Sequence, residues 1–212
     1  NTLKSFNSTQ DVFLYQTDLS LNGTWVHNFS GAGDEYCYSL EVEDDEYVYL
    51  AGYSNSINLS LDSSDIKLTR ELIGGQDGIV TKYYSDGRLD WFNNYGGISN
   101  DQIYDISEYN NDLYITGLYS DEVIWNKDTI KTNGTLDKGV FLGKIDNTSG
   151  NPIKVNTING QLNYEERGKN VLVNDYSVYS ISVFESDSIQ LEDSTLYNDT
   201  PVELNTIITK LD

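Results

Sequence analysis

Two side chains in this sequence belong to types that often perform chemistry. The chain contains one histidine, His27, and one cysteine, Cys37, among its 212 residues. A zinc site needs several nitrogen or sulfur ligands, and a Ser-His-Asp arrangement would have to use His27 alone. A single cysteine cannot form an internal disulfide, and the tyrosines on both sides of Cys37 predict a strand with a small buried thiol. The sequence therefore predicts no catalytic residue.

An acidic turn supplies the best candidates for a metal site. Asp146, Asn147 and Ser149 lie close together in the sequence, and carboxylate and amide oxygens are ligands that calcium prefers. Their spacing matches neither an EF-hand nor a nonapeptide calcium loop, and the segment corresponds to a plain Ser-Asp-Gly turn at residues 85–87. We therefore expect no cofactor, and calcium is the one ion for which the sequence offers ligands.

One tryptophan is placed where it could bind a ligand. Trp125 lies in a segment that interrupts a repeated pattern, and the corresponding segments carry Leu59 and Leu191 instead. An exposed Trp125 among 17 tyrosines would suit stacking against a sugar or a partner surface. The other interpretation is that this segment packs onto its own sheet. Asp and Glu total 34, so a carboxylate pair for glycoside hydrolysis could be drawn from many positions, and no spacing favours one pair.

Several features indicate an exported protein. Methionine is absent and the first residue is Asn1, which predicts a processed precursor or a fragment, located outside the cell or at its surface. Sequons for N-linked glycans add to this, and two of them fall in corresponding hairpin turns. The sequons begin at Asn7, Asn22, Asn28, Asn58, Asn133, Asn147 and Asn198.

The charge of the chain excludes several kinds of partner. Asp and Glu outnumber Lys and Arg by 34 to 13, which gives a net charge of -21. Such a charge repels nucleic acid and anionic lipid head groups. No apolar run approaches the roughly 20 residues that a membrane-spanning helix needs. We expect neither nucleic-acid binding nor membrane insertion.

A repeated apolar pattern predicts the architecture. Val-Phe-Leu-Tyr at residues 12–15 returns in related form at 79–82, 140–144 and 207–210, at intervals of roughly 65 residues. The strands are short and rich in Val, Ile, Tyr, Phe and Thr, and turn pairs such as Asn22-Gly23 separate them, which is typical of antiparallel hairpins. The sequence therefore predicts an all-β chain of repeats that share their cores.

We expect one repeat domain over residues 1–212. Its parts are the end of one repeat at 1–10, repeats at 11–76, 77–138 and 139–204, and the start of a further repeat at 205–212. The strands fall into groups of two (12–29), four (37–95), four (103–158) and three (171–211). Segments 54–76, 120–138 and 185–204 interrupt the groups and are predicted to form protruding hairpins.

The repeat resembles the SBBP-type β-propeller repeat of secreted and cell-surface proteins. The resemblance covers nearly the whole chain and rests on Asp77, Lys82, Gly87, Trp91, Gly96, Gly97, Asp101 and Gly117. It implies four-stranded antiparallel blades around an axis. Propellers close with about four to eight blades, and this chain supplies about three, so the ring is expected to be incomplete. Another antiparallel β-sandwich or a solenoid is the alternative fold.

These observations favour a structural or interaction module without catalytic activity. It is expected to assemble with other protein subunits, with copies of itself or with further repeats, through open β-edges. A glycan-binding, lectin-like module that uses Trp125 is the first alternative. A carboxylate-based hydrolase is the second.

Overall fold

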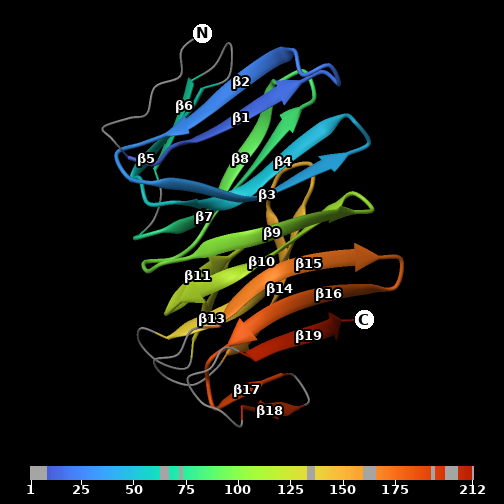
Figure 1. The fold of residues 1–212 in the computed structure, drawn as a ribbon. Coiled ribbons are helices and arrows are strands. Elements are labelled where there is room, and N and C mark those ends of the chain that lie inside the picture. Colours follow the sequence, from blue (N-terminus) through green and yellow to red (C-terminus); the bar gives the residue numbers. More distant parts are fainter. Residues whose placement is uncertain are drawn as a thin grey trace.

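The computed structural model describes residues 9–62, 67–71, 74–132, 137–159, 166–191, 194–198 and 205–211. These residues form strands, turns and bends (Figure 1), which confirms the predicted all-β class. Within these ranges, no helix is long and apolar enough to cross a membrane.

The described residues form five antiparallel sheets, and the four larger ones follow one another along the chain. The first has the order β1-β2-β5-β6, from Val12–Thr17, Gly23–Ser30, Asn58–Asp62 and Lys67–Glu71. The second has the order β3-β4-β7-β8, from Glu35–Glu43, Tyr47–Ser54, Asp77–Tyr84 and Leu89–Tyr95. The third contains β9 (Gln102–Tyr109), β10 (Asp112–Ser120), β13 (Lys138–Asp146) and β14 (Pro152–Asn159). The fourth has the order β15-β16-β19, from Arg167–Asn174, Ser177–Phe184 and Asn205–Leu211.

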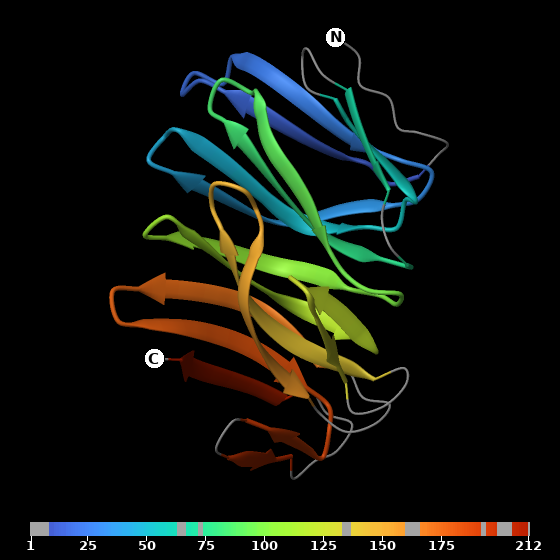
Figure 2. The ribbon, with the colours of Figure 1, turned by 180° about the vertical axis from the view of Figure 1, so that it is seen from behind.

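The strand groups match those predicted from the sequence. The second and third sheets contain four consecutive repeat strands each, the first contains β1 and β2, and the fourth contains three strands. The sheets are stacked one upon another (Figures 1 and 2). Residues that hold the same register in different sheets are called counterparts below.

The three interrupting segments form hairpins, but they do not protrude alone. The hairpin of β5 and β6 pairs with β2, and the hairpin of β17 (Ser188–Gln190) and β18 (Thr195–Tyr197) pairs with β14. In the hairpin of β11 (Glu122–Trp125) and β12 (Asp128–Lys131), the Ile124 amide donates to the Gly96 carbonyl just after β8, at 3.4 Å. Each hairpin therefore contacts the last strand of the preceding sheet, which has an open edge to satisfy.

Apolar side chains fill the spaces between successive sheets. One cluster, with Phe29 and Tyr83, lies between the first and second sheets; another, with Tyr49 and Phe141, lies between the second and third. A smaller cluster that includes Ile207 joins the third and fourth sheets. The core is thus shared between neighbours, as the repeat predicted.

The first strand of each of the last three sheets has a bulge at the same place. Tyr38 in β3, Tyr104 in β9 and Lys169 in β15 are the extra residues. Next to the first two bulges the backbones approach closely, and a Cβ atom at Gly52 or Gly117 would lie 1.9 Å from a carbonyl oxygen. Glycine permits this close approach at the first two bulges, whereas the bulge of the fourth sheet has Ser182 at the corresponding position.

Candidate functional site

A tryptophan and a turn join each neighbouring pair of the first three sheets. The indole nitrogen of Trp25 on β2 donates to the Ser85 carbonyl in the β7–β8 turn at 3.0 Å. Its counterpart Trp91 on β8 donates to the Asn147 carbonyl in the β13–β14 turn at 2.9 Å. Both turns contain a glycine in the left-handed region, which lets the backbone pass over the indole ring.

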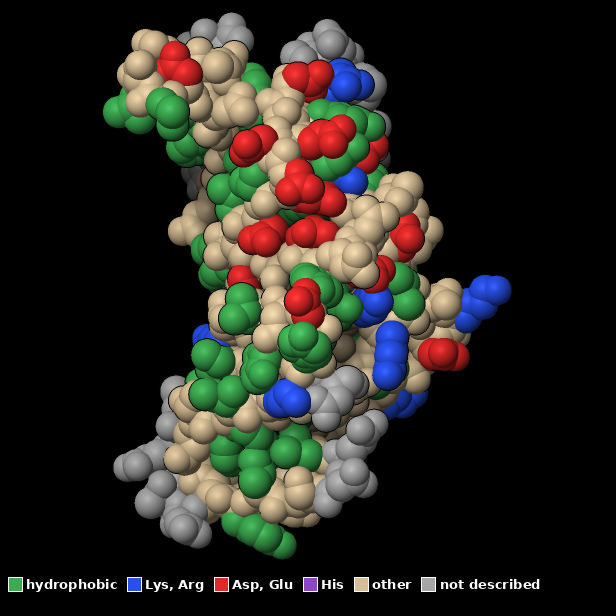
Figure 3. Space-filling view, turned by 90° about the vertical axis from the view of Figure 1, so that its right-hand side faces the viewer, with side chains coloured by type: hydrophobic (Ala, Val, Ile, Leu, Met, Phe, Trp, Pro, Cys, Tyr) green, Lys and Arg blue, Asp and Glu red, His purple; other side chains and the backbone are tan. Residues whose placement is uncertain are grey.

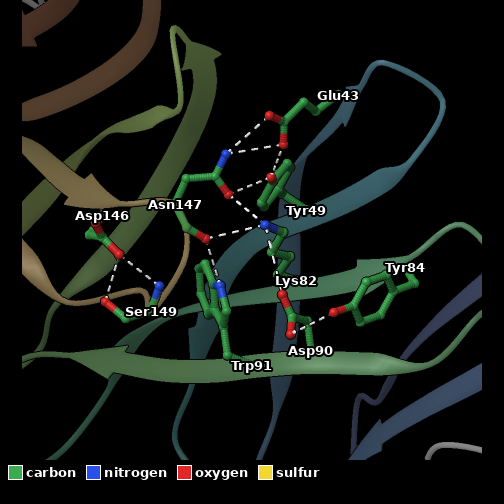
Figure 4. A network of polar contacts seen from close by, with 9 residues as sticks. All are labelled: Glu43, Tyr49, Lys82, Tyr84, Asp90, Trp91, Asp146, Asn147 and Ser149. Carbon is green, nitrogen blue, oxygen red and sulfur yellow. Dashed lines mark hydrogen bonds and ion pairs between the residues drawn. The ribbon is translucent and has the colours of Figure 1, made fainter.

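The second of these junctions contains a buried polar network (Figure 4). Asn147 is 2 % exposed, and its amide oxygen accepts hydrogen bonds from Lys82 Nζ at 2.8 Å and from the Tyr49 hydroxyl at 2.6 Å. Its amide nitrogen donates to both carboxylate oxygens of Glu43, at 3.1 and 3.2 Å. Burial and the Glu43 carboxylate raise the pKa of Tyr49. One turn of the third sheet thereby satisfies charged groups of the second.

The ammonium of Lys82 is held from several sides. It forms an ion pair with the Asp90 carboxylate at 3.7 Å and lies 3.8 Å from the centre of the Tyr47 ring. Only 6 % of this side chain is exposed. A buried ammonium needs such partners because burial removes its hydration. The network is therefore a structural joint with little access for a ligand.

The predicted calcium ligands do not converge on one point. The Asp146 carboxylate accepts hydrogen bonds from the Ser149 amide at 2.8 Å and hydroxyl at 2.7 Å, and these bonds lower the pKa of Asp146. They close the turn, whereas the Asn147 side chain points into the joint (Figure 4). Within the described ranges, no group of three or more His, Cys, Asp or Glu side chains could hold a metal ion.

The junction between the third and fourth sheets lacks an equivalent turn in the described chain. There, a hollow of about 730 Å³ is lined by Tyr109, Tyr114, Lys144, Lys154 and Lys210, among others. The Lys144 ammonium contacts the Asp112 carboxylate at 2.6 Å and lies 5.5 Å from the centre of the Tyr114 ring. The arrangement can attract an anionic group.

Tyrosines form a row across the bulged strands. The Tyr36 ring stacks on Tyr53 with centroids 4.8 Å apart, and Tyr38 stacks on Tyr104 at the same distance. The Lys169 ammonium completes the row, 4.7 Å from the centre of the Tyr104 ring. Tyr38 is 46 % exposed. Sequence reasoning missed this row, although a bulge residue recurs at the same place in each repeat.

Three buried carboxyls also recur at the start of the bulged strands. Glu35, Asp101 and Glu166 are at most 2 % exposed, and loss of hydration raises the pKa of each to about 7. The Glu35 carboxyl accepts hydrogen bonds from Ser54 and Ser56, and Asp101 accepts from the backbone amides of residues 97 and 120. Ser186 donates to Glu166 in the same way. Hydrogen-bonded carboxyls thus support each repeat.

Trp125 is buried, which argues against the predicted ligand role. It is 3 % exposed, and its ring lies 5.7 Å from the Tyr95 ring and 6.1 Å from the Phe141 ring. Gly143 leaves the room for it, because a Cβ atom there would lie 2.2 Å from the indole. The hairpin packs against β13 of its own sheet, as the other interpretation held, and also against Tyr95 of the preceding sheet.

The two rare side chains have opposite surroundings. His27 is 2 % exposed and stacks on the Tyr83 ring at 5.0 Å, so it belongs to the core. Cys37 is exposed, and the prediction of a buried thiol was wrong. Its counterpart Ile103 is buried against the second sheet, which contains β3 and β4. The described part of the first sheet has no strands equivalent to β3 and β4, so Cys37 on β3 is not covered. The protein around its sulfur still raises the pKa of Cys37 to about 11.

The predicted glycosylation residues lie in different surroundings. Asn22 and Asn58 are exposed, Asn28 is half-buried, and Asn147 and Asn198 are buried. Asn7 and Asn133 lie outside the described residues. The Asn147 amide already donates to Glu43, so a glycan there would require that side chain to leave the joint.

Comparisons with known proteins add no family assignment. A scan of the sequence against protein-family models gave no match, and neither did a search of curated proteins.

Proposed function

We propose that this chain is a β-propeller-like interaction module without catalytic activity, located at the cell surface or outside the cell. It assembles with further protein, in the first instance a second copy, through the two ends of its sheet stack. The repeat pattern, the acidic surface and the four stacked sheets support this proposal. Blades around an axis are the arrangement that the resemblance to SBBP-type repeats implies.

The observation that carries the proposal concerns apolar residues at the two ends. Phe13 on β1 is 64 % exposed, whereas its counterparts Ile79 and Phe141 are 6 % and 3 % exposed. At the other end, Ile208 on β19 is 68 % exposed, and its counterpart Val80 is fully buried. Large exposed apolar side chains at such places are typical of interaction surfaces.

The two ends are chemically complementary. Inside the stack, the sheet face that carries a counterpart of Ile208 packs against the face of the next sheet that carries a counterpart of Phe13. The end with Ile208 can therefore receive the end with Phe13 from another copy, in a head-to-tail contact. The net charge of -21 opposes this contact, so we expect salt to strengthen it.

Sedimentation velocity over a range of protein and salt concentrations tests the proposal. The wild-type chain should form species larger than 23.9 kDa. Phe13→Ser and Ile208→Ser should each abolish association, whereas an equimolar mixture of the two variants should form dimers, because one intact interface remains. A wild-type chain that stays at 23.9 kDa under all conditions would overturn the proposal.

The tyrosine row favours glycan binding as a second candidate function. Trp125 is buried, but the Tyr38 ring is 46 % exposed and stacks on Tyr104, whose ring contacts the Lys169 ammonium. A glycan array probed with wild-type protein and with Tyr38→Ala tests this candidate, and equal signals from both proteins would exclude it.

The hydrolase alternative gains no support from the hollows. The three hollows described here contain at most one carboxyl each, Asp45 in one and Asp175 in another, so none of them holds a carboxylate pair. The carboxyls with a pKa of about 7 lie elsewhere, each buried at the start of a strand.

A further inference from the structure

The joint around Asn147 shows what this type of junction binds when it is filled. The turn between β13 and β14 enters the space in front of Tyr49 and Lys82, and β14 continues from it as the fourth strand of its sheet. Asn147 supplies the oxygen that meets the Lys82 ammonium at 2.8 Å. The occupant is therefore a peptide turn with a hydrogen-bond acceptor, followed by a strand.

The next junction repeats the receiving surface without an occupant in the described chain. Tyr114 and Lys144 pair across β10 and β13 just as Tyr49 and Lys82 pair across β4 and β7. They line the 730 Å³ hollow. A second hollow of about 670 Å³ shares Leu142 with it and runs along β19, whose one described partner is β16.

Two replacements change the charge that this surface prefers. The counterpart of Trp91 is Lys154, which pairs directly with Lys144, and the counterpart of Glu43 is Tyr109. Like charges opposite each other destabilise a sheet, and the Asp112 carboxylate, 2.6 Å from the Lys144 ammonium, compensates only one of the two. Lys210 of β19 lines the same hollow, so three of the 13 basic residues of a chain with net charge -21 gather here beside one acidic lining residue, Asp175.

The molecular surface agrees with this distribution. Figure 3 shows the side toward which the β3–β4, β9–β10 and β15–β16 turns point in Figure 1. Asp and Glu side chains gather over its upper and middle parts, and Lys and Arg side chains lie mostly below them. An anionic group is therefore attracted to the lower part of this side.

We propose that the lysine hollow, lined by Lys144, Lys154 and Lys210, binds an acidic turn of another protein chain. A carboxylate takes the place that the Asn147 amide has in the filled joint. The strand that follows this turn adds to β19 in antiparallel fashion, as a fourth strand of the sheet. This inference rests on the proposed function, because it names one edge through which assembly occurs and the chemistry of the partner.

A pair of labelled peptides tests the inference on the whole chain. The first peptide has the sequence of residues 145–159, which is the β13–β14 turn with its fourth strand, and the second carries Asn147→Asp. Fluorescence anisotropy measures the affinity of both. We expect the Asp peptide to bind about tenfold more tightly at low salt, with the preference decreasing as salt is added. Equal affinities, or no binding of either peptide, would overturn the inference.

Charge variants of the protein locate the contact. Lys154→Glu should remove the preference for the Asp peptide, and Lys154→Gln should reduce it. Lys127→Glu makes the same charge change on an exposed turn between β11 and β12, and should leave the preference intact. Equal effects of Lys127→Glu and Lys154→Glu would show a general charge effect and refute the assigned contact.

Two outcomes separate this inference from its alternatives. An anionic oligosaccharide that binds in a Lys154-dependent manner, while neither peptide binds, would identify an anionic glycan site and overturn the protein-turn proposal. Head-to-tail association depends on Phe13 and Ile208, which lie outside the 730 Å³ hollow. If the chain associates but shows no preference for the Asp peptide, only the acidic-turn inference is refuted. If it prefers the Asp peptide but does not associate, only the assembly with a second copy is refuted.

Discussion

Asn147 accepts a hydrogen bond from the Lys82 ammonium at 2.8 Å, although the two residues are 65 positions apart and lie in different sheets. Lys82 is 5 % exposed and Asn147 is 2 % exposed, so water cannot easily replace either partner. This contact links the stability of the second sheet to the turn of the third.

Removal of this acceptor should destabilise the whole chain. Asn147→Ala leaves the Lys82 ammonium and the Tyr49 hydroxyl without their shared oxygen, and we expect the free energy of unfolding to fall by about 2 to 4 kcal/mol. Urea denaturation measures the change. Thr148→Ala, at an exposed position of the same turn, is the control and should cost less than about 0.5 kcal/mol. Similar losses for both variants would contradict the role of the joint.

The buried carboxyls predict that stability decreases as the pH rises from about 5 to 8. The pKa of Glu166 is about 7 in the folded chain and lies near its ordinary value of 4.5 in the unfolded chain. Between these values the folded chain binds more protons, so raising the pH through this window favours unfolding. Glu35 and Asp101 act in the same direction.

Glu166→Gln isolates the contribution of one carboxyl. The amide keeps an oxygen for the Ser186 hydroxyl but cannot ionise. Between pH 5 and pH 8, the free energy of unfolding should fall by about 1 to 3 kcal/mol less in this variant than in the wild-type chain. Denaturation at both pH values measures it. An unchanged difference would mean that Glu166 ionises in the folded chain as it does in water.

Below this window, other carboxyls act in the opposite direction. The pKa of Asp146 is lowered by its hydrogen bonds to Ser149, and the pKa of Asp86 is lowered by Arg88. Their contribution is present above the ordinary value of 3.8 and is lost as the pH falls through the lowered pKa values. We therefore expect maximum stability between about pH 4 and 6.

Cys37 should react slowly although it is exposed. Its pKa of about 11 leaves far less thiolate at pH 8 than an ordinary cysteine has. We expect iodoacetamide to modify the native chain roughly 100-fold more slowly than the chain unfolded in urea, as followed by mass spectrometry. Equal rates in both states would show that the folded protein does not perturb this thiol.

Gly117 should not tolerate a larger side chain. A Cβ atom there would lie 1.9 Å from the Gln102 carbonyl oxygen, so Gly117→Val must disrupt the bulge at Tyr104. We expect a loss of more than about 2 kcal/mol in urea denaturation. Ser182→Ala, at the counterpart that already has a side chain, should cost about 1 kcal/mol or less. A mild effect of Gly117→Val would show that the bulge is adaptable.

The repeat pattern was sufficient to predict the strands and the groups they form. Period-two apolar runs and Gly-containing turns are local signals, and Trp25 and Trp91 could be matched because each opens a comparable hairpin strand. The direction in which the hairpins fold was not predictable in this way, because β5 and β17 pair with the preceding sheet through backbone bonds.

The candidate sites depended on contacts between repeats, which local patterns do not contain. Asn147 was assigned to calcium or a glycan because its neighbours are polar, yet its partners Lys82 and Tyr49 lie in another repeat. Trp125 was considered as an exposed residue because its segment is an insertion, but Gly143 on β13, the strand after the hairpin, leaves a space for its ring. The repeated runs end in lysines at matched positions, Lys82, Lys144 and Lys210, but the run was used only to count repeats and these lysines were assigned no site.

The hairpins have a mechanical consequence for the chain. Each hairpin is inserted between two strands of one sheet and is hydrogen-bonded to the sheet before it, so neighbouring sheets are connected both by their packed faces and by backbone hydrogen bonds. A force applied between the ends of the chain must break these hydrogen bonds before it can separate two sheets. We expect a rupture pattern with fewer and larger steps than an array without such hairpins would show.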